Sequence, residues 1–234
     1  MKSKVWLAVS LLLVVTGLIT WYTRPAFVRA EFPEHGETFN SSGEPVDIGD
    51  RGDLCSSLQR EDGYLLISGI ISLATTGVSQ GFLQTSDGES GLFFEYDPGE
   101  DSLLRFGLHQ SDGSTDRVKY RNLWKGGAFN FSILVRSDGT LRMIGDDTDE
   151  SSKVEKLLID CSNFRIAAAN GSEGINGTMT VSISAGPNAQ QAEELIEEYV
   201  SLYNKSLPST LYKWPLYAGV LLLVIGNPWA WRKK

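Results

Sequence analysis

The chain has 234 residues, of which 41% are hydrophobic and 21% are charged, and its formal net charge is −8. All 29 acidic residues lie between Glu31 and Glu198, whereas eight of the 21 basic residues lie in or beside the two chain ends. The middle of the chain is therefore strongly acidic, which excludes nucleic acid as a partner because like charges repel. The same acidity also fits a domain that needs only to stay soluble.

The first expected element is an apolar helix close to the N-terminus. Val5–Tyr22 carries no charge, and a helix needs roughly twenty apolar residues to cross a bilayer core. Lys2 and Lys4 precede this run, and positive flanks favour the cytoplasmic side of a membrane. Residues 1–30 are predicted to be an uncleaved membrane anchor, with a cleaved signal peptide ending near Ala30 as the alternative.

Residues 31–50 are polar and contain prolines and glycines, so they are predicted to be a linker. From residue 51 onward, short apolar stretches alternate with Ser-Asp-Gly and Asp-Pro-Gly turn signals, which indicates strands. The expected strands are Tyr64–Leu73, Gly81–Thr85, Gly91–Tyr96, Leu103–His109, Val118–Leu123, Phe129–Arg136, Thr140–Ile144, Lys156–Asp160, Phe164–Ala168 and Thr178–Ala185. Ten short strands within residues 51–186 predict an all-β domain, a jelly-roll sandwich of two antiparallel sheets.

One amphipathic helix is expected after the strands, over residues 187–207. Glutamates fill one of its faces, and the other face is apolar and consists of Ala192, Leu195, Ile196, Tyr199 and Tyr203. This apolar face is predicted to pack on the sandwich or on a second copy of the chain, which would make a homo-oligomer through residues 188–204. Residues 211–231 form a second apolar run, predicted to span the membrane, with a buried hydrophobic hairpin as the alternative.

The two cysteines, Cys55 and Cys161, lie in the stretch that the terminal runs would place outside the cytoplasm. Disulfides form in such oxidising compartments, so the cysteines are predicted to pair, with two free buried thiols as the alternative. A bridge that closes about a hundred residues would contribute roughly 4–5 kcal/mol in the chain-entropy model. Glycosylation is a further modification to expect if the host uses the sequons at Asn40, Asn130, Asn170, Asn176 and Asn204.

The stretch Phe129–Gly145 resembles the laminin-G-like branch of the concanavalin A-like lectin and glucanase superfamily. The likeness rests on a strand at Ile133–Val135, an Asp138-Gly139 turn and a strand that runs into Gly145. Upstream and downstream strands fit the family in the same order, so the likeness covers the whole expected sandwich. The resemblance implies the jelly-roll fold, and laminin-G-like domains often carry calcium at a sheet rim.

A carboxylate motif offers an enzymatic alternative. Glu95, Asp97 and Glu100 follow the E-x-D-x-x-E spacing of retaining glucanases that share this sandwich. By that analogy Glu95 is the nucleophile and Glu100 the acid/base, because retaining hydrolysis needs two carboxyl groups about 5–5.5 Å apart. Pro98 and Gly99 interrupt the strand between them, which favours an acidic hairpin turn instead.

Two further sets of residues are candidates for binding. Calcium binds six to eight oxygens, and a carboxylate cluster in an expected loop is a candidate calcium site, with a solvated acidic loop as the alternative. These carboxylates are Asp146, Asp147 and Asp149. Sugar binding by a sandwich needs aromatic rings at the surface, although such rings can equally belong to the core or its rim. The candidate rings are Trp124, Tyr120 and Tyr96.

Three functions remain open. The leading hypothesis is a module, not an enzyme, that is anchored in the cell membrane with its sandwich outside the cytoplasm and binds a glycan or an envelope or extracellular protein. The alternatives are a glucanase-type glycoside hydrolase that uses Glu95 and Glu100, and a structural subunit without a ligand. Carboxylates converging on a cleft would favour the hydrolase, and a large apolar surface patch would favour the structural subunit.

Overall fold

The computed structural model describes residues 2–22, 34–75, 77–86, 91–99, 103–109, 115–121, 127–145, 148–155, 157, 159–169, 172–206 and 213–225. The chain divides into two units. Unit 1 comes from the chain ends and contains the helices α1 (Lys2–Tyr22) and α4 (Lys213–Ile225). Unit 2 spans Ala30–Tyr203 and contains all the strands described.

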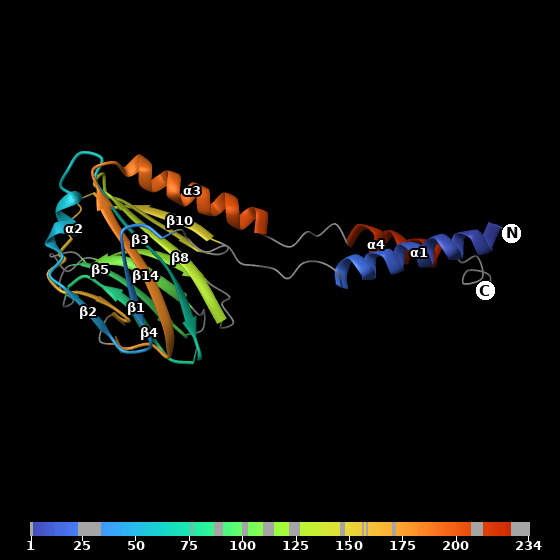
Figure 1. Ribbon diagram of the computed structural model, residues 1–234, viewed down its shortest axis with the longest axis horizontal. Helices are drawn as coiled ribbons and strands as arrows, with labels where there is room; N and C mark the ends of the chain where they lie inside the picture. Colours follow the sequence, from blue (N-terminus) through green and yellow to red (C-terminus); the bar gives the residue numbers. More distant parts are fainter. Residues whose placement is uncertain are drawn as a thin grey trace. The chain divides into compact units, whose positions relative to one another are not determined.

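Unit 2 is a sandwich of two six-stranded antiparallel sheets (Figure 1). Sheet A has the order β1-β14-β3-β8-β9-β10, with strands β1 (Glu37–Ser41), β3 (Tyr64–Leu73), β8 (Gly127–Arg136), β9 (Thr140–Gly145), β10 (Thr148–Lys153) and β14 (Gly177–Gly186). Sheet B has the order β2-β11-β4-β5-β6-β7, with strands β2 (Val46–Gly49), β4 (Gln80–Gln84), β5 (Gly91–Asp97), β6 (Leu103–His109), β7 (Thr115–Arg121) and β11 (Phe164–Ile166). A short pair is formed by β12 (Ala168–Ala169) and β13 (Ser172–Glu173). The predicted two-sheet antiparallel sandwich is confirmed.

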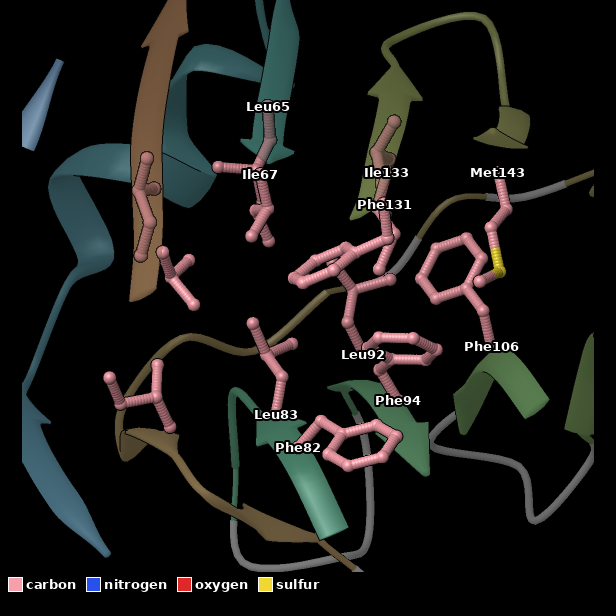
Figure 2. Close-up of a cluster of buried hydrophobic side chains, with 14 of the residues drawn as sticks. Leu65, Ile67, Phe82, Leu83, Leu92, Phe94, Phe106, Phe131, Ile133 and Met143 are labelled. Atoms are coloured by element: carbon pink, nitrogen blue, oxygen red, sulfur yellow. The ribbon is translucent and has the colours of Figure 1, made fainter. Parts of the chain in front are cut away.

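The main core lies between the sheets because alternate residues of each strand point to the same side. Leu65 and Ile67 of β3 are fully buried there, and their side chains face those of sheet B (Figure 2). Phenylalanine rings link the two sheets. The ring centroid of Phe94 lies 5.0 Å from that of Phe82, also in sheet B, and 4.9 Å from that of Phe131 in sheet A. Tilted rings at this separation pack favourably.

A second apolar cluster lies on the outer face of sheet A, under α3 (Ala189–Ser206). Its fully or nearly fully buried members are Tyr64, Leu66, Leu134 and Ile144 from the sheet and Ala189, Ala192, Ile196 and Tyr199 from the helix. Arg142 of β9 adds ion pairs at 2.5 Å to Glu193 and at 3.3 Å to Glu197. The predicted helix is confirmed, and its apolar face packs on the sandwich. Of the two partners predicted for this face, the structure shows the sandwich, and a homo-oligomer through residues 188–204 stays a prediction.

The segment predicted to be a linker, residues 31–50, instead contributes one edge strand to each sheet. β1 pairs with β14 in sheet A, and β2 pairs with β11 in sheet B. Phe39, Val46 and Ile48 pack against the core from these strands. An edge strand pairs with a neighbour on one side only. Few apolar residues are enough to hold it there, so composition alone does not predict it.

The stretch Lys156–Asp160, predicted to be a strand, contains no strand in its described residues. Leu157 and Ile159 are partly buried against the core, so this apolar run anchors a loop that leads to Cys161. The outer position in sheet A belongs to the polar strand β10, where sequence analysis expected an acidic loop.

Cys55 and Cys161 form a disulfide with their Cα atoms 6.0 Å apart, as predicted. Cys55 lies in α2 (Gly52–Ser57), and Cys161 lies in the loop before β11, so the bridge joins a helix to a loop. The Arg51 N–H donates a hydrogen bond of 2.9 Å to the Cys161 carbonyl next to the bridge. Leu54 of α2 is buried in the main core, so the bridge holds this helix against the sandwich.

Both apolar terminal runs are helical, and in unit 1 the two helices pack through small residues. A Cβ atom added at Gly17 would lie 2.9 Å from the Leu216 nitrogen, and one at Gly219 would lie 2.9 Å from the Val14 nitrogen. Ser10 is fully buried in the same seam. Among the residues described, no helix combines the length and the apolar character needed to cross a membrane.

Candidate functional site

The outer face of sheet B carries a charged group built by β5 and β6. Alternation along β5 sends Phe94 and Tyr96 into the core and leaves Glu95 and Asp97 on the opposite face. Arg105 of β6 lies directly opposite Glu95 in the ladder. Its Nη1 is 3.6 Å from Glu95 Oε1, and its Nη2 donates a hydrogen bond to Asp97 Oδ2. One guanidinium therefore joins two carboxylates at a partly exposed surface.

An aromatic pair lies beside this charged group. The rings of Phe93 and His109 are stacked, with centroids 4.5 Å apart and planes inclined by 23°. Phe93 is opposite Gly107 in the ladder, where a side chain is absent, and it is nearly fully buried, whereas His109 is half-buried. At the edge of the sheet, residues 107, 105 and 103 lie opposite Arg117, Lys119 and Arg121 of β7.

We define the sheet B face as Glu95, Asp97, Arg105 and His109, with the buried Phe93 ring stacked against His109. It offers hydrogen-bond donors, acceptors and an aromatic edge within one strand pair. Glycans and peptide segments are held by such combinations of a few polar groups and rings.

Of the aromatic residues predicted to bind sugar, Tyr96 is placed clearly. It is 1% exposed and belongs to the main core, so the prediction that it forms part of a ligand platform is wrong. The reason is the alternation of β5, which cannot present Glu95 and Tyr96 on the same face. Tyr120 lies on β7, opposite Leu104. Trp124 falls outside the described residues.

Of the three predicted calcium ligands, only Asp149 lies among the described residues. Asp149 lies on β10, where its carboxylate accepts hydrogen bonds of 2.8 and 2.6 Å from Arg142. The pairing with Asp149 raises the pKa of Arg142 above its ordinary value. Asp146 and Asp147 fall outside the described residues, and no group of three possible metal ligands occurs within the part that is described. Asp149 therefore serves the ion-pair network under α3.

The residues of the hydrolase alternative are placed in part. Glu95 and Asp97 do share a face, as the spacing predicts, and Arg105 lies between them. β5 ends at Asp97, and the Gly99 N–H donates to Asp97 Oδ1 at 3.0 Å, so the strand stops at the Pro-Gly pair. Glu100, the acid/base of that alternative, falls outside the described residues.

A partly buried histidine on the outer face of sheet A was not indicated by the sequence pattern. The ring of His35, just before β1, lies 2.9 Å from Ser184 Oγ through Nδ1 and 2.9 Å from Ser68 Oγ through Nε2. Ser68 in turn shares a 2.8 Å hydrogen bond with Ser132. Burial lowers the pKa of His35 to about 4. The available signal was the row of serines inside apolar strands, since buried hydroxyls need partners.

No protein-family model matches the chain, and no curated protein matches it in sequence. Solved structures do resemble it. The sandwich is shared with receptor-binding domains of botulinum neurotoxins. The domain of the C/D mosaic serotype has a TM-score of 0.51 at 12% identity, with 74% of this chain and 46% of that chain covered.

Two other structures give the same picture. The receptor-binding domain of botulinum neurotoxin D has a TM-score of 0.50 at 13% identity, with 74% of this chain and 47% of that chain covered. The binding domain of neurotoxin DC in complex with rat synaptotagmin II has a TM-score of 0.50 at 12% identity and covers 74% of this chain. The chain thus spans about half the length of the structures it matches. At such identities the likeness shows the sandwich fold alone.

Proposed function

We propose that the chain is a binding module that is attached to a membrane by the helices of unit 1. Unit 1 associates with a membrane, and unit 2 binds a glycan or a protein outside the cytoplasm through the sheet B face. The observation that carries the proposal is the packing of the two helices in unit 1, where small residues face inward and large apolar residues face outward.

Most of the exposed residues described in unit 1 are large and apolar, and the others are Ala8, Thr16, Lys213 and Ala218. The large apolar residues are between 42% and 74% exposed, and they are Leu7, Val9, Leu11, Leu12, Val15, Leu18, Ile19, Trp214, Tyr217, Val220 and Leu221. In water such a surface is unfavourable by about 25 cal/mol per Å². In lipid it carries no penalty, and close packing through Gly and Ser is how helices associate there. The helix pair therefore suits an apolar solvent.

Two observations support a location outside the cytoplasm for unit 2. Lys2 and Lys4 lie in the first turn of α1, ahead of its apolar run, and three basic residues, 232–234, follow the second apolar run, as in helix flanks that stay on the cytoplasmic side. The disulfide between Cys55 and Cys161 is the kind of bond that persists in oxidising compartments.

The choice of the sheet B face follows from the use of the other face. α3 covers the outer face of sheet A, whereas none of the described helices packs on the outer face of sheet B. The binding domain of neurotoxin DC, 46% of which matches this chain, was solved in complex with rat synaptotagmin II, which supports protein binding by a domain that contains such a sandwich. Because Arg105 already pairs with Glu95 and Asp97, we favour recognition of a polar ligand over hydrolysis.

Membrane association is tested with charge substitutions on exposed apolar positions. Leu12→Glu should move the chain from the alkali-resistant membrane fraction to the soluble fraction, because Leu12 is 66% exposed on α1. Val78→Glu is the matched control, since Val78 is 53% exposed in unit 2. Equal membrane retention of both variants would contradict the tether.

Ligand binding is tested with the full chain in nanodiscs on a glycan array and against surface proteins of the source cell. Arg105→Gln should weaken binding roughly tenfold, as expected for loss of a charge-assisted hydrogen bond. Arg60→Gln, a change at an exposed arginine of the turn after α2, should leave binding unchanged. If both variants bind like the unchanged chain, the sheet B face is not the site.

A further inference from the structure

His35 is held by serine side chains from two neighbouring strands. Both ring nitrogens lie 2.9 Å from a hydroxyl, Nδ1 from that of Ser184 on β14 and Nε2 from that of Ser68 on β3. The backbone N–H of His35 donates to Ser182 Oγ at 2.8 Å, and that hydroxyl donates back to the His35 carbonyl. Every polar atom of this residue therefore binds sheet A.

The serines form a row in the sheet register. Ser182 of β14 lies opposite Ser68 of β3, which lies opposite Ser132 of β8. These three residues are at most 6% exposed. Buried hydroxyls cost free energy unless they are hydrogen-bonded, and His35 provides the partner at one end of the row. The contact thus joins the start of β1 to three strands of sheet A.

The backbone next to His35 is shaped for this contact. Gly36 has a φ of +72°, which side chains rarely tolerate, and a Cβ there would lie 2.0 Å from the Ile183 carbonyl oxygen. The close approach places the chain flat on β14 immediately before the pairing of Glu37 with Ile183 begins. Gly36 and the His35 ring therefore act together to dock the start of β1.

No acidic side chain serves as counter-ion for the ring among its hydrogen-bond partners, which are all serines. On β1, Glu37 pairs with Arg51 at 2.9 Å. On α3, which packs on the same face of sheet A, Glu193 pairs with Arg136 and Arg142, and Glu197 pairs with Arg142. The other titratable side chains buried in that cluster are Tyr199 of α3 and Tyr64 of β3. Glu34 is exposed at the neighbouring position. A proton on the imidazole would thus create a partly buried charge with no acidic group among its hydrogen-bond partners, which is unfavourable.

We propose that the contact of His35 with Ser68, Ser182 and Ser184 is a pH-sensitive latch, which releases the start of β1 from sheet A when the imidazole takes up a proton. At neutral pH the ring is uncharged, and one nitrogen donates while the other accepts. In acid the charged ring leaves the serines for water. This loosens the connection through which the sandwich continues toward α1, while the inter-sheet core stays intact.

The first test is an NMR titration of labelled histidine in the full chain, held in detergent micelles. The chain has two histidines, so the His35→Gln variant assigns the signals. Burial predicts a His35 midpoint near pH 4, about two units below free imidazole. A midpoint at pH 6 or above in the folded chain would overturn the proposal.

The second test is hydrogen exchange of the amides of β1 between pH 7.5 and 4.5, corrected for intrinsic rates. In the unchanged chain, opening of β1 should increase roughly tenfold or more over this range. His35→Gln, which stays neutral and can still donate and accept, should abolish this dependence. Amides of β8, deep in sheet A, are the internal control and should stay protected.

A second variant keeps the test decisive if His35→Gln disturbs the fold. Gly36→Ala should undock the start of β1 at every pH, since its Cβ would meet the Ile183 carbonyl, and exchange there should be fast already at pH 7.5. Exchange that rises in acid equally in the unchanged chain and in both variants would show that another group titrates, and the latch would be wrong.

Discussion

Single polar residues in sheet A show how a hydroxyl is tolerated inside an apolar strand. Ser68 lies between apolar neighbours on β3, yet it is 2% exposed. It is satisfied by the His35 ring and by Ser132, at 2.9 and 2.8 Å. Because Ser68 and Ser132 occupy the outer face, the main core keeps its fully apolar character. The free-energy cost of burying these two hydroxyls is offset by their hydrogen bonds to each other and to His35, which precedes β1.

The same histidine makes stability depend on pH. Its pKa in the folded chain is lowered to about 4, so the unfolded chain binds more protons between about pH 6.5 and 4. The His35 contribution is therefore fully present above pH 6.5 and is lost as the pH falls through this window. Allowing for partial exposure of the ring, we expect a loss on the order of 1–2 kcal/mol.

This loss is measured by denaturant unfolding of the unchanged chain and His35→Gln at pH 7.5 and 5.0. The difference between the two proteins should shrink in acid, because only the unchanged chain loses the contribution of His35. A difference that stays constant over this range would contradict the assigned pKa direction.

The disulfide is the other residue-scale device. Its cysteines are 106 residues apart, and removing a cross-link that closes a loop of that length lowers the stability by about 4–5 kcal/mol in the chain-entropy model. We expect Cys55→Ser combined with Cys161→Ser to lower the unfolding temperature markedly while the sheets still form. Thermal unfolding with and without reductant checks this, because reductant should affect only the unchanged chain.

At the scale of elements, α3 is held by one apolar stripe and by ion pairs with two arginines, Arg136 and Arg142. Ile196 is 1% exposed between the helix and sheet A, whereas Leu202 on the same helix is 45% exposed. Ile196→Ala should destabilise the chain by about 2–5 kcal/mol, and Leu202→Ala by under about 0.5 kcal/mol. Urea unfolding measures both. Equal effects would mean that α3 is not docked as described.

Sequence pattern identified the central strands because these are long and apolar at alternate positions. β3 and β6 have the predicted bounds, Tyr64–Leu73 and Leu103–His109. The edge strands β1 and β10 were not identified, since they read as polar segments in which pairing with one neighbour provides the order. The edge strand β7 of sheet B overlaps the predicted strand Val118–Leu123. In the opposite sense, the apolar stretch Lys156–Asp160 packs on the core without a strand partner, because burial does not require pairing.

The candidate site was predictable to a similar degree. The spacing of Glu95 and Asp97 places them on one face of a strand, and the structure confirms this through their common partner Arg105. The same rule places Tyr96 in the core, which excludes it as a ligand platform. His35 was beyond reach of local pattern, because its hydrogen bond to Ser184 spans 149 residues.

At the scale of the whole molecule, the first and last described segments of unit 2 both contact the outer face of sheet A. His35 binds the outer face of sheet A just after the N-terminal connection, and α3 packs on that face just before the C-terminal one. The outer face of sheet A is thus covered in part by His35 and by α3. The outer face of sheet B, with Arg105 and its two carboxylates, is the layer that remains for a ligand.

The limits of the folding unit follow from the pairing of β1 and β2. β1 covers the edge of β14 over five residues, from Glu37 to Ser41, and β2 pairs with β11 in the other sheet. A fragment of residues 51–206 would lack both strands and would leave the edge of β14 exposed, a configuration that promotes association. It would also lose the burial of Phe39, Val46 and Ile48, each of which is worth about 1.5–3 kcal/mol when complete.

We therefore expect residues 34–206 to fold as a stable monomer and residues 51–206 to aggregate or to unfold at a much lower temperature. Size-exclusion chromatography and thermal unfolding of the two fragments, prepared in parallel with the disulfide formed, distinguish these outcomes. The bridge is common to both fragments, so a difference between them reports the edge strands alone. A monomeric 51–206 fragment with an unchanged unfolding temperature would mean that β1 and β2 decorate a sandwich that is complete without them.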